Sequence, residues 1–453
     1  MLNRALLERY RCPESLAEFN LTGKLSPDAG FFTFGPHTVC YGKTAAGSRS
    51  HEPAAGLYDT CGDVTTSDSQ VVMPFDPNAI IDNLRLERYT LHHNLNGRQS
   101  LPQKALRFAY YSLRPFFSVP VRRHIQKAYL RGWEKRSFPH WPVDNTVENI
   151  LEQCLAFAMR AKGLTEIPFI WFWPGGAPAC ALMTHDVETG LGRDFTSALM
   201  DINDEHHMKA SFQVVPEKRY EVPESYLSRI RDRGFEIAVQ DLNHDGHLYS
   251  NREEFLRRAQ LIRQYSKKFG ATGFRAAILY RNCDWLPELD FSYDMSIPNV
   301  AHLDPQSGGC CTLFPYFIGR TLEIPVTTTQ DYSLFHIIGQ YTLDLWKKQT
   351  SQILAKHGLM NFIVHPDYIV DEKPQQIYRD LLTYLSQLRA EQHLWIPMPH
   401  EVDEWWRARG QMHLVDNGGT WRIEGAGRER ARVAYARLKN GKLTYSFDRS
   451  PSQ

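Results

Sequence analysis

The chain has 453 residues, which is too long for one ordinary hydrophobic core, so we expect two or three domains. Its composition, 42% hydrophobic and 23% charged, is typical of a folded globular protein, and Lys+Arg 52 against Asp+Glu 51 gives a formal net charge of +1. No basic block supplies the concentrated positive charge that a phosphate backbone requires, which argues against a nucleic-acid partner.

The N-terminus has charges every few positions and no apolar stretch of signal-peptide length. No window approaches ~18 uninterrupted apolar residues, so a transmembrane segment is not predicted. We therefore expect a cytoplasmic protein. The eight cysteines form no CxxC pair, and we expect reduced and mostly buried thiols.

Residues 1–95 are predicted to form a β-rich region. Short β-prone runs such as "FFTFG", "HTVCYG" and "SQVVMPF" alternate with clusters of Gly, Pro, Ser and Asp. A single helix is predicted here, opening at Asp76 with Pro77 in its first turn. Residues 96–167 are predicted to be a helical connector, whose Arg and Lys residues have the spacing of a solvated helix face.

From residue 168 to 410, apolar runs alternate with helical patterns, which predicts a mainly parallel sheet or barrel. The run "ACALMTH" is continuously apolar, as expected of a strand buried on both faces. The clearest helix follows Asn251, the expected cap, with Glu254 at the capping-box position and Gly270 at its end. Residues 411–453 contain the turn signals "DNGG" and "KNGK", which predict a small β-hairpin module.

Polar residues follow several of these predicted strands directly. In parallel α/β architectures, the reactive groups collect where strands end at their carboxyl edge. We therefore expect one site that combines carboxylates, imidazoles and a guanidinium from His185, Asp186, Glu188, Gln240, Asp241, His244, Arg275, Gln330, Asp331, His365 and Asp367.

Four segments, "LMTHDVE", "FEIAVQDLNHDGH", "GFRAA" and "FIVHPDY", resemble in order and spacing the motifs of the polysaccharide deacetylase family, the chitin-deacetylase-like carbohydrate esterases. The resemblance covers residues 168–410, over half of the chain. It implies a distorted (β/α) barrel of seven or so strands. The activity it implies is the metal-dependent removal of acetyl groups from N-acetylated sugars of a cell-surface, capsular or lipid-linked glycan.

The resemblance also implies the catalytic roles. Asp186 matches the general base, Arg275 the arginine that orients this base, and His365 the general acid. In this chemistry the base takes a proton from water as it attacks the amide carbonyl, and the acid passes a proton to the departing amine. A divalent metal ion lowers the pKa of water toward about 7 and bears part of the oxyanion charge.

The predicted metal site departs from the family pattern at one position. The resemblance implies a divalent ion, usually zinc, on Glu188, His244 and residue 240, but residue 240 is a glutamine where the family has a histidine. An amide oxygen is a poorer zinc ligand than an imidazole nitrogen. Three explanations compete: a metal held through the Gln240 oxygen, a metal for which His247 substitutes as ligand, or a metal-free relic that binds glycans.

Other residues have less specific assignments. Asp241 and Asp245 are candidate oxygen ligands, and Tyr280, Trp285 and Tyr368 are candidates for binding the substrate. The principal prediction is a metal-dependent carbohydrate deacetylase. Two alternatives stay open, namely a catalytically inactive glycan-binding protein of the same fold and a hydrolase of other linear or cyclic amides.

Overall fold

The computed structural model describes residues 1–47, 49–53, 56–90 and 119–448, with side chains from residue 124 onward in the last range. The predicted helical run at 101–117 lies outside the described residues. The chain forms two compact units. The first consists of the described residues of Met1–His93, Asn145–Ala177 and Glu404–Gln453, and the second of those of Asn94–Asp144 and Pro178–Asp403.

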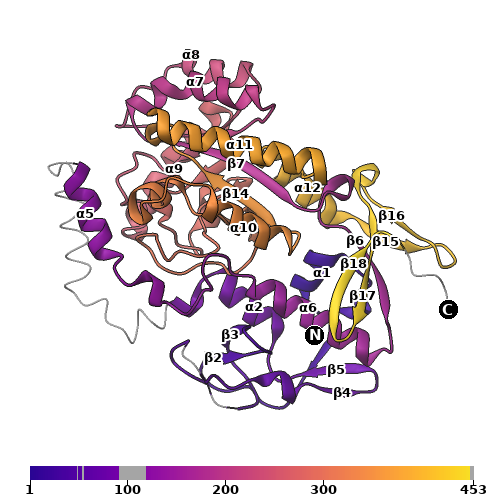
Figure 1. Ribbon diagram of the computed structural model, residues 1–453. Helices are drawn as coiled ribbons and strands as arrows, with labels where there is room; N and C mark the ends of the chain where they lie inside the picture. Colours follow the sequence, from indigo (N-terminus) through magenta and orange to yellow (C-terminus); the bar gives the residue numbers. More distant parts are fainter. Residues whose placement is uncertain (48, 54–55, 91–118, 449–453) are drawn as a thin grey trace. The chain divides into compact units, whose positions relative to one another are not determined.

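The first unit is built from short strands and a few helices (Figure 1). Its principal elements are α1 (Arg4–Tyr10), β1 (Phe19–Leu21), β2 (Gly30–Thr33), β3 (Val39–Gly42), β4 (Thr65–Ser67), β5 (Gln70–Met73), α2 (Pro77–Arg85), α6 (Thr146–Ala161), β6 (Glu166–Ile170), β15 (His413–Asp416), β16 (Trp421–Glu424), β17 (Val433–Lys439) and β18 (Lys442–Ser446). The helix predicted after Asp76 is confirmed, since the Asp76 carboxylate accepts from the Asn78 amide. The prediction of a single helix in residues 1–95 is wrong, because α1 also forms there and Asn3 caps it.

The C-terminal strands form two hairpins at the predicted turn signals, β15–β16 and β17–β18. Strand β17 also pairs antiparallel with β6, from Val433 opposite Ile170 to Arg437 opposite Glu166. The tail is therefore joined by a three-stranded sheet to the segment that follows α6, and it is not a separately folded appendage.

The second unit contains an eight-stranded sheet in the order β12-β13-β11-β10-β9-β8-β7-β14, parallel except for β12 against β13. Its strands are β7 (Cys180–Val187), β8 (Ser211–Val214), β9 (Glu236–Gln240), β10 (Gly273–Arg275), β11 (Tyr293–Asp294), β12 (Tyr316–Ile318), β13 (Thr321–Glu323) and β14 (Leu359–Ile363). This is the predicted mainly parallel α/β architecture, and β12 and β14 lie at the two edges of the sheet. The predicted strand at "LWIPM" is wrong, because only an isolated bridge between Cys180 and Trp395 forms there.

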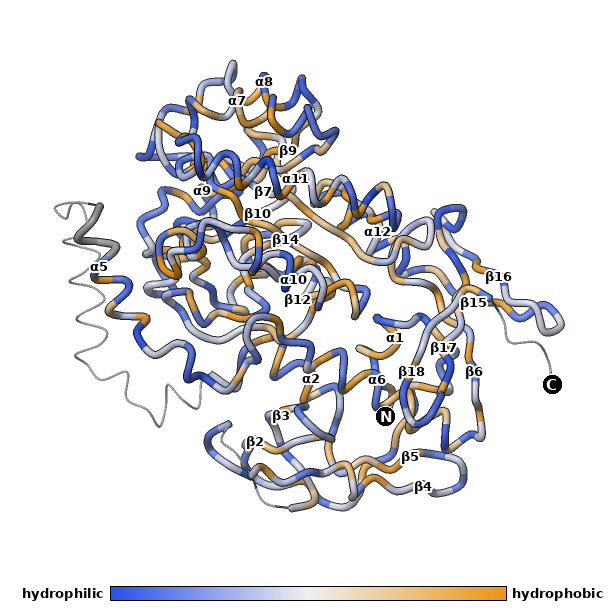
Figure 2. The backbone as a smooth tube through the Cα atoms, viewed as in Figure 1, coloured by the Kyte–Doolittle hydropathy of each residue, from blue (hydrophilic) through white to orange (hydrophobic). Residues whose placement is uncertain are grey.

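Helices connect the parallel strands. They are α7 (Gly190–Glu205), α8 (Glu224–Asp232), α9 (Arg252–Phe269) and α10 (Asp344–Leu354). In the chain, α5 (Val119–Tyr129) precedes the sheet, and α11 (Glu372–Gln392) and α12 (Pro399–Gln411) follow it. Strand β7 is apolar along most of its course and all of its residues are buried (Figure 2). None of the helices in the described part of the chain combines the length and the apolar character needed to cross a bilayer.

Candidate active site

The sheet topology brings the predicted site residues together at one edge. Asp186 is near the end of β7, Gln240 ends β9 and Arg275 ends β10, while His365 follows β14 by two residues. Arg275 is in register with Gln240, and β14 runs parallel to β7. Because these strands all point the same way, their last side chains lie at the same end of the sheet.

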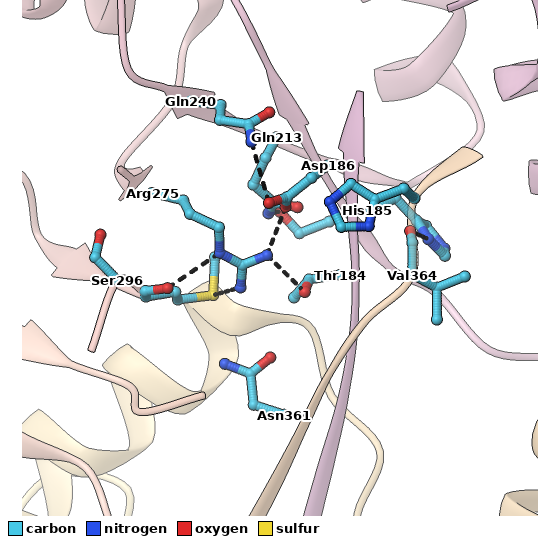
Figure 3. A network of polar contacts seen from close by, with 12 residues as sticks. Thr184, His185, Asp186, Gln213, Gln240, Arg275, Ser296, Asn361 and Val364 are labelled. Atoms are coloured by element: carbon cyan, nitrogen blue, oxygen red, sulfur yellow. Dashed lines mark hydrogen bonds and ion pairs between the residues drawn. The ribbon is translucent and has the colours of Figure 1, made fainter. Parts of the chain in front are cut away.

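Asp186 is held through both of its carboxylate oxygens (Figure 3). Arg275, which is fully buried, donates from Nη1 to Asp186 Oδ1 at 2.6 Å and to the Thr184 hydroxyl at 2.9 Å, and its Nε donates to the Met295 carbonyl at 3.0 Å. Gln240 donates from Nε2 to Asp186 Oδ2 at 3.1 Å. The carboxylate is therefore fixed in orientation by a charged and a neutral donor.

His365 is paired with Asp331, for which the sequence predicted no individual catalytic role. Its Nδ1 donates to Asp331 Oδ1 at 2.6 Å, and its backbone amide donates to Asp331 Oδ2 at 2.8 Å. Burial alone would lower the pKa of His365, but the Asp331 carboxylate, assisted by Glu188, raises it well above its usual value. The imidazole is therefore protonated and has a proton to donate from Nε2. The one signal for Asp331 in the sequence was its position after the run "LEIPVT".

Glu188 lies between two imidazoles. Its Oε1 is 2.8 Å from His244 Nε2 and 3.5 Å from His365 Nε2. Burial alone would raise the pKa of Glu188, but these two imidazoles lower it well below its usual value. Asp367 steadies the segment, because its carboxylate accepts from the Glu188 amide at 3.1 Å and from the Thr189 hydroxyl.

Two residues at the predicted metal position have buried atoms without hydrogen-bond partners. Neither ring nitrogen of His244 has a hydrogen-bond partner, although Nε2 lies 2.8 Å from Glu188 Oε1, and Gln240 Oε1 also lacks one. Among the described residues, no three His, Cys, Asp or Glu side chains form a metal-ligand group. The donor atoms of the predicted site, the Glu188 carboxylate, the His244 imidazole and the Gln240 amide oxygen, nevertheless suit a divalent cation. The amide oxygen would take the position of a third ligand that is ionisable in a His, Asp or Glu site.

The other candidate ligands have different partners. Both oxygens of Asp245 accept from Arg258, at 2.7 and 2.9 Å, and Asp241 Oδ1 accepts from the Leu242 amide at 2.6 Å. His247 donates from its backbone amide to Asp245. Asp245 is therefore bound to Arg258 of α9.

His185 lies in the core and not with the other residues of the predicted site. Its Nδ1 donates to the Val364 carbonyl at 2.9 Å, since a carbonyl can only accept, and its Nε2 accepts from Asn203 Nδ2 at 3.2 Å. The Tyr378 hydroxyl of α11 lies 3.3 Å from the same Nε2. His185 therefore joins β7 to the helices that cover it.

The three candidate substrate-binding residues lie in different surroundings. The Tyr368 ring centroid is 4.9 Å from that of His365. Trp285 instead packs against Phe255 of α9 at 5.4 Å, and Tyr280 is buried, with 4% of its surface exposed. Of the three, Tyr368 is the one that the structure places beside a predicted catalytic residue.

Sequence reasoning missed an aromatic cluster around Tyr368. The rings of Tyr332 and His336 each lie 5.3 Å from the Tyr368 ring and from each other. All three side chains are half-buried. His336 lies in a π-helical turn, Ser333–Ile338, a rare conformation that is frequent at functional sites.

Comparison with known proteins gives matches at the level of structure. No family model matches the chain, and no curated protein sequence matches it. Polysaccharide deacetylases are among its structural neighbours. A protein from Mycobacterium smegmatis described as a polysaccharide deacetylase matches over 53% of this chain and 94% of its own, with 17% identity and a TM-score of 0.44.

Two further neighbours have similar descriptions. A polysaccharide deacetylase from Pseudomonas aeruginosa PAO1 matches over 52% of this chain and 93% of its own, with 13% identity and a TM-score of 0.41. The Bc1960 peptidoglycan N-acetylglucosamine deacetylase matches over 51% and 90%, with 14% identity and a TM-score of 0.33. At these identities and TM-scores, we derive the chemistry from the side chains of this chain.

Proposed function

We propose that this chain is a carbohydrate deacetylase, a hydrolase that removes acetyl groups from N-acetylated sugars of a cell-surface, capsular or lipid-linked glycan. The observation that supports it most is that a carboxylate of fixed orientation and a charged imidazole both lie where the parallel strands of the sheet end. Asp186 has both oxygens held by Arg275 and Gln240, and His365 is paired with Asp331.

These groups suit the two proton transfers of amide hydrolysis. Asp186 accepts a proton from a water molecule while the oxygen of that water bonds to the acetyl carbonyl carbon. His365 donates its proton to the sugar nitrogen as the C–N bond breaks, so that acetate and a free amine are formed. Each such transfer by a positioned side chain contributes typically about 10²–10⁴-fold to the rate.

A divalent cation, zinc in the first instance, is part of this proposal. Glu188 and His244 would hold it, since Glu188 Oε1 and His244 Nε2 lie 2.8 Å apart and the ring nitrogens of His244 have no hydrogen-bond partner. When bound, such an ion supplies Lewis acidity, which activates water and polarises a carbonyl.

The proposed substrate is a sugar because of the surroundings of His365. The half-buried rings of Tyr332, His336 and Tyr368 form an aromatic surface next to the proposed acid. Aromatic faces of this kind offer apolar area with polar edges, which suits the alternating CH and OH groups of a sugar ring.

The proposal is tested by acetate release from an N-acetylated oligosaccharide, together with the metal content of the purified protein. We expect bound divalent metal, activity that is lost on chelation, and a fall of at least about 10²-fold in kcat for folded Asp186→Asn. Its free energy of unfolding should also fall, because the buried Arg275 loses its charge partner. Asp380→Asn, which alters an exposed carboxylate on α11, is the matched control and keeps full activity. Metal-free protein that binds glycans without releasing acetate would replace the proposal with the binding-protein alternative.

A further inference from the structure

We propose that Gln240 has two roles in this site. Its amide oxygen is a ligand for the divalent cation, and its amide nitrogen fixes the orientation of the Asp186 carboxylate. The inference rests on the proposed function for the identity of the reaction. It concerns this chain in particular, because a histidine at position 240 would supply a ring nitrogen to the cation in place of an amide oxygen.

The hydrogen bond to Asp186 determines which way the Gln240 amide faces. A carboxylate oxygen accepts, so the amide group that lies 3.1 Å from Asp186 Oδ2 is the nitrogen. The amide oxygen then points away from Asp186, as Figure 3 shows. Gln240 ends β9 in register with Arg275, so the two donors to Asp186 come from neighbouring strands.

The outward oxygen of Gln240 has no partner within the chain. The side chain is buried, with 1% of its surface exposed, and Oε1 makes no hydrogen bond. A buried acceptor left in this state costs about 1–3 kcal/mol, a cost that a donor or a cation beside Gln240 would remove. His244, four residues further on, is equally buried, and neither of its ring nitrogens has a hydrogen-bond partner.

The backbone between these residues is held in an uncommon conformation. Asp241 and His244 both have left-handed φ, 52° and 53°. Non-glycine residues in this region cost of order 1–3 kcal/mol and concentrate where a ligand is held. The chain turns after β9, and His244 Nε2 lies 2.8 Å from Glu188 Oε1.

Gln213 provides a matched comparison on the neighbouring strand β8. It is a fully buried glutamine opposite Asp186 in register, and its Oε1 also lacks a partner. Its Nε2, however, donates to the Ser211 hydroxyl at 2.8 Å and not to Asp186. A substitution at Gln213 therefore reports the effect of altering a buried glutamine near the site without altering the proposed ligand.

With Gln240 as a ligand, the site is richer in oxygen ligands than a site with two histidines. Its donors are one carboxylate, one imidazole and one amide oxygen. Oxygen donors suit harder ions such as Mn²⁺, whereas imidazole favours Zn²⁺. The preference for Zn²⁺ over Mn²⁺ should consequently be weaker in this chain than in its Gln240→His variant.

The first experiment measures metal binding by the full chain after chelation, by calorimetric titration with Zn²⁺ or Mn²⁺ alone. Gln240→Met should raise both Kd values at least about 10-fold, and Gln240→His should raise the ratio of Zn²⁺ to Mn²⁺ affinity at least about 10-fold. Gln213→Met should leave both Kd values within about 2-fold. With Co²⁺ as the probe, the visible spectrum should change in Gln240→His and remain unchanged in Gln213→Met.

The second experiment separates the ligand role from the positioning role. Gln240→Glu keeps an oxygen ligand but loses the N–H that reaches Asp186, so metal binding should be retained. At saturating metal, its kcat for acetate release should fall at least about 10-fold while KM is unchanged. The reason is that Asp186, the proposed proton acceptor, is then no longer held in position by the N–H of residue 240.

Unchanged Kd values in Gln240→Met, or a wild-type chain that binds neither metal, would overturn the ligand role. Full kcat in Gln240→Glu would overturn the positioning role. If Gln240→Met does not fold, the affinity ratio and the Co²⁺ spectrum of Gln240→His decide the ligand role. If the metal affinities follow the expected pattern but no N-acetylated sugar is hydrolysed, the ligand role stands and the proposed function fails.

Discussion

Asp331 determines the charge of the proposed acid. It is fully buried, its Oδ1 accepts from His365 Nδ1 at 2.6 Å, and its Oδ2 accepts from the backbone amide of the same residue. Both carboxylate oxygens thus bind the same residue, one its imidazole and the other its backbone amide. The carboxylate raises the pKa of His365, so the proton-donating form persists at a pH where an ordinary histidine would be neutral.

Asp331→Asn should lower kcat by about 10²–10⁴-fold. The acid form of His365 is lost as the pH rises through its pKa, and removing the carboxylate lowers that pKa. The alkaline limb of the kcat profile should therefore move to lower pH. The measurement is kcat against pH for acetate release, with Asp344→Asn on α10 as control. An alkaline limb at the wild-type position would contradict the pairing.

His185 should make folding depend on pH. Burial lowers its pKa to about 4, against 6.5 for an ordinary histidine. The unfolded chain therefore takes up a proton between pH 6.5 and 4 that the folded chain does not. The stabilisation is present in full above about pH 6.5 and is lost as the pH falls toward 4, with a limiting value of about 3 kcal/mol.

The test compares the free energy of unfolding of the wild type and of His185→Gln at pH 7.5 and pH 5. The variant should be less stable at pH 7.5, because contacts with Val364 and Asn203 are lost. Its stability should also fall less between the two pH values. Equal falls in both proteins would show that His185 does not contribute to the pH dependence.

At the scale of the element, helix α9 shows how local signals set the boundaries of a helix. The Asn251 side chain accepts from the Glu254 amide at 2.9 Å, and Gly270 ends the helix with φ +63°. The second hydrogen bond of the predicted capping box, from the Asn251 backbone amide to the Glu254 carboxylate, does not form. The Glu254 carboxylate binds Arg257 and Arg258 instead, because charged donors are stronger partners than a backbone amide.

Asn251→Ala should destabilise the chain by about 1 kcal/mol, since one orphan amide of the first turn loses its acceptor. Asn251→Ser should recover most of this loss, because serine is an equally good cap. Denaturant unfolding followed by circular dichroism measures both variants. Equal stability of the alanine and serine variants would show that the cap is not used.

At the scale of the whole molecule, the first unit is assembled from three separate parts of the sequence. Arg409 links them, because its buried guanidinium donates to the carbonyls of Glu8, Arg9, Ile170 and Trp171 at 2.6–2.9 Å. These carbonyls belong to the end of α1 and to the end of β6. One side chain therefore satisfies backbone groups from two segments that are far apart in sequence.

Arg409→Met should destabilise the first unit by at least about 3 kcal/mol, because several buried carbonyls lose a charged donor. Arg428→Met, at an exposed position of the same unit, should change the free energy of unfolding by less than about 0.5 kcal/mol. Urea unfolding of the two variants makes the comparison. A stable Arg409→Met protein would mean that water replaces the guanidinium at these carbonyls.

The sequence by itself determined the elements of the parallel sheet and the edge at which the polar residues gather. The apolar run that opens Cys180–Val187 predicts a buried strand from its own composition, and residues after parallel strands share an edge. It thereby predicted that Asp186, Arg275 and His365 share one site. It also indicated the cap at Asn251 and both C-terminal hairpins, since these depend on neighbours in the chain.

Only the tertiary structure decided which polar residues pair. It matched Asp331 with His365 and Gln240 with Asp186, placed His185 in the core, and paired β17 with β6. The physical reason is that hydrogen bonds, burial and pKa shifts depend on distances of a few ångströms between segments that are 30–270 residues apart. Such distances are set by packing and leave no periodic pattern in the sequence.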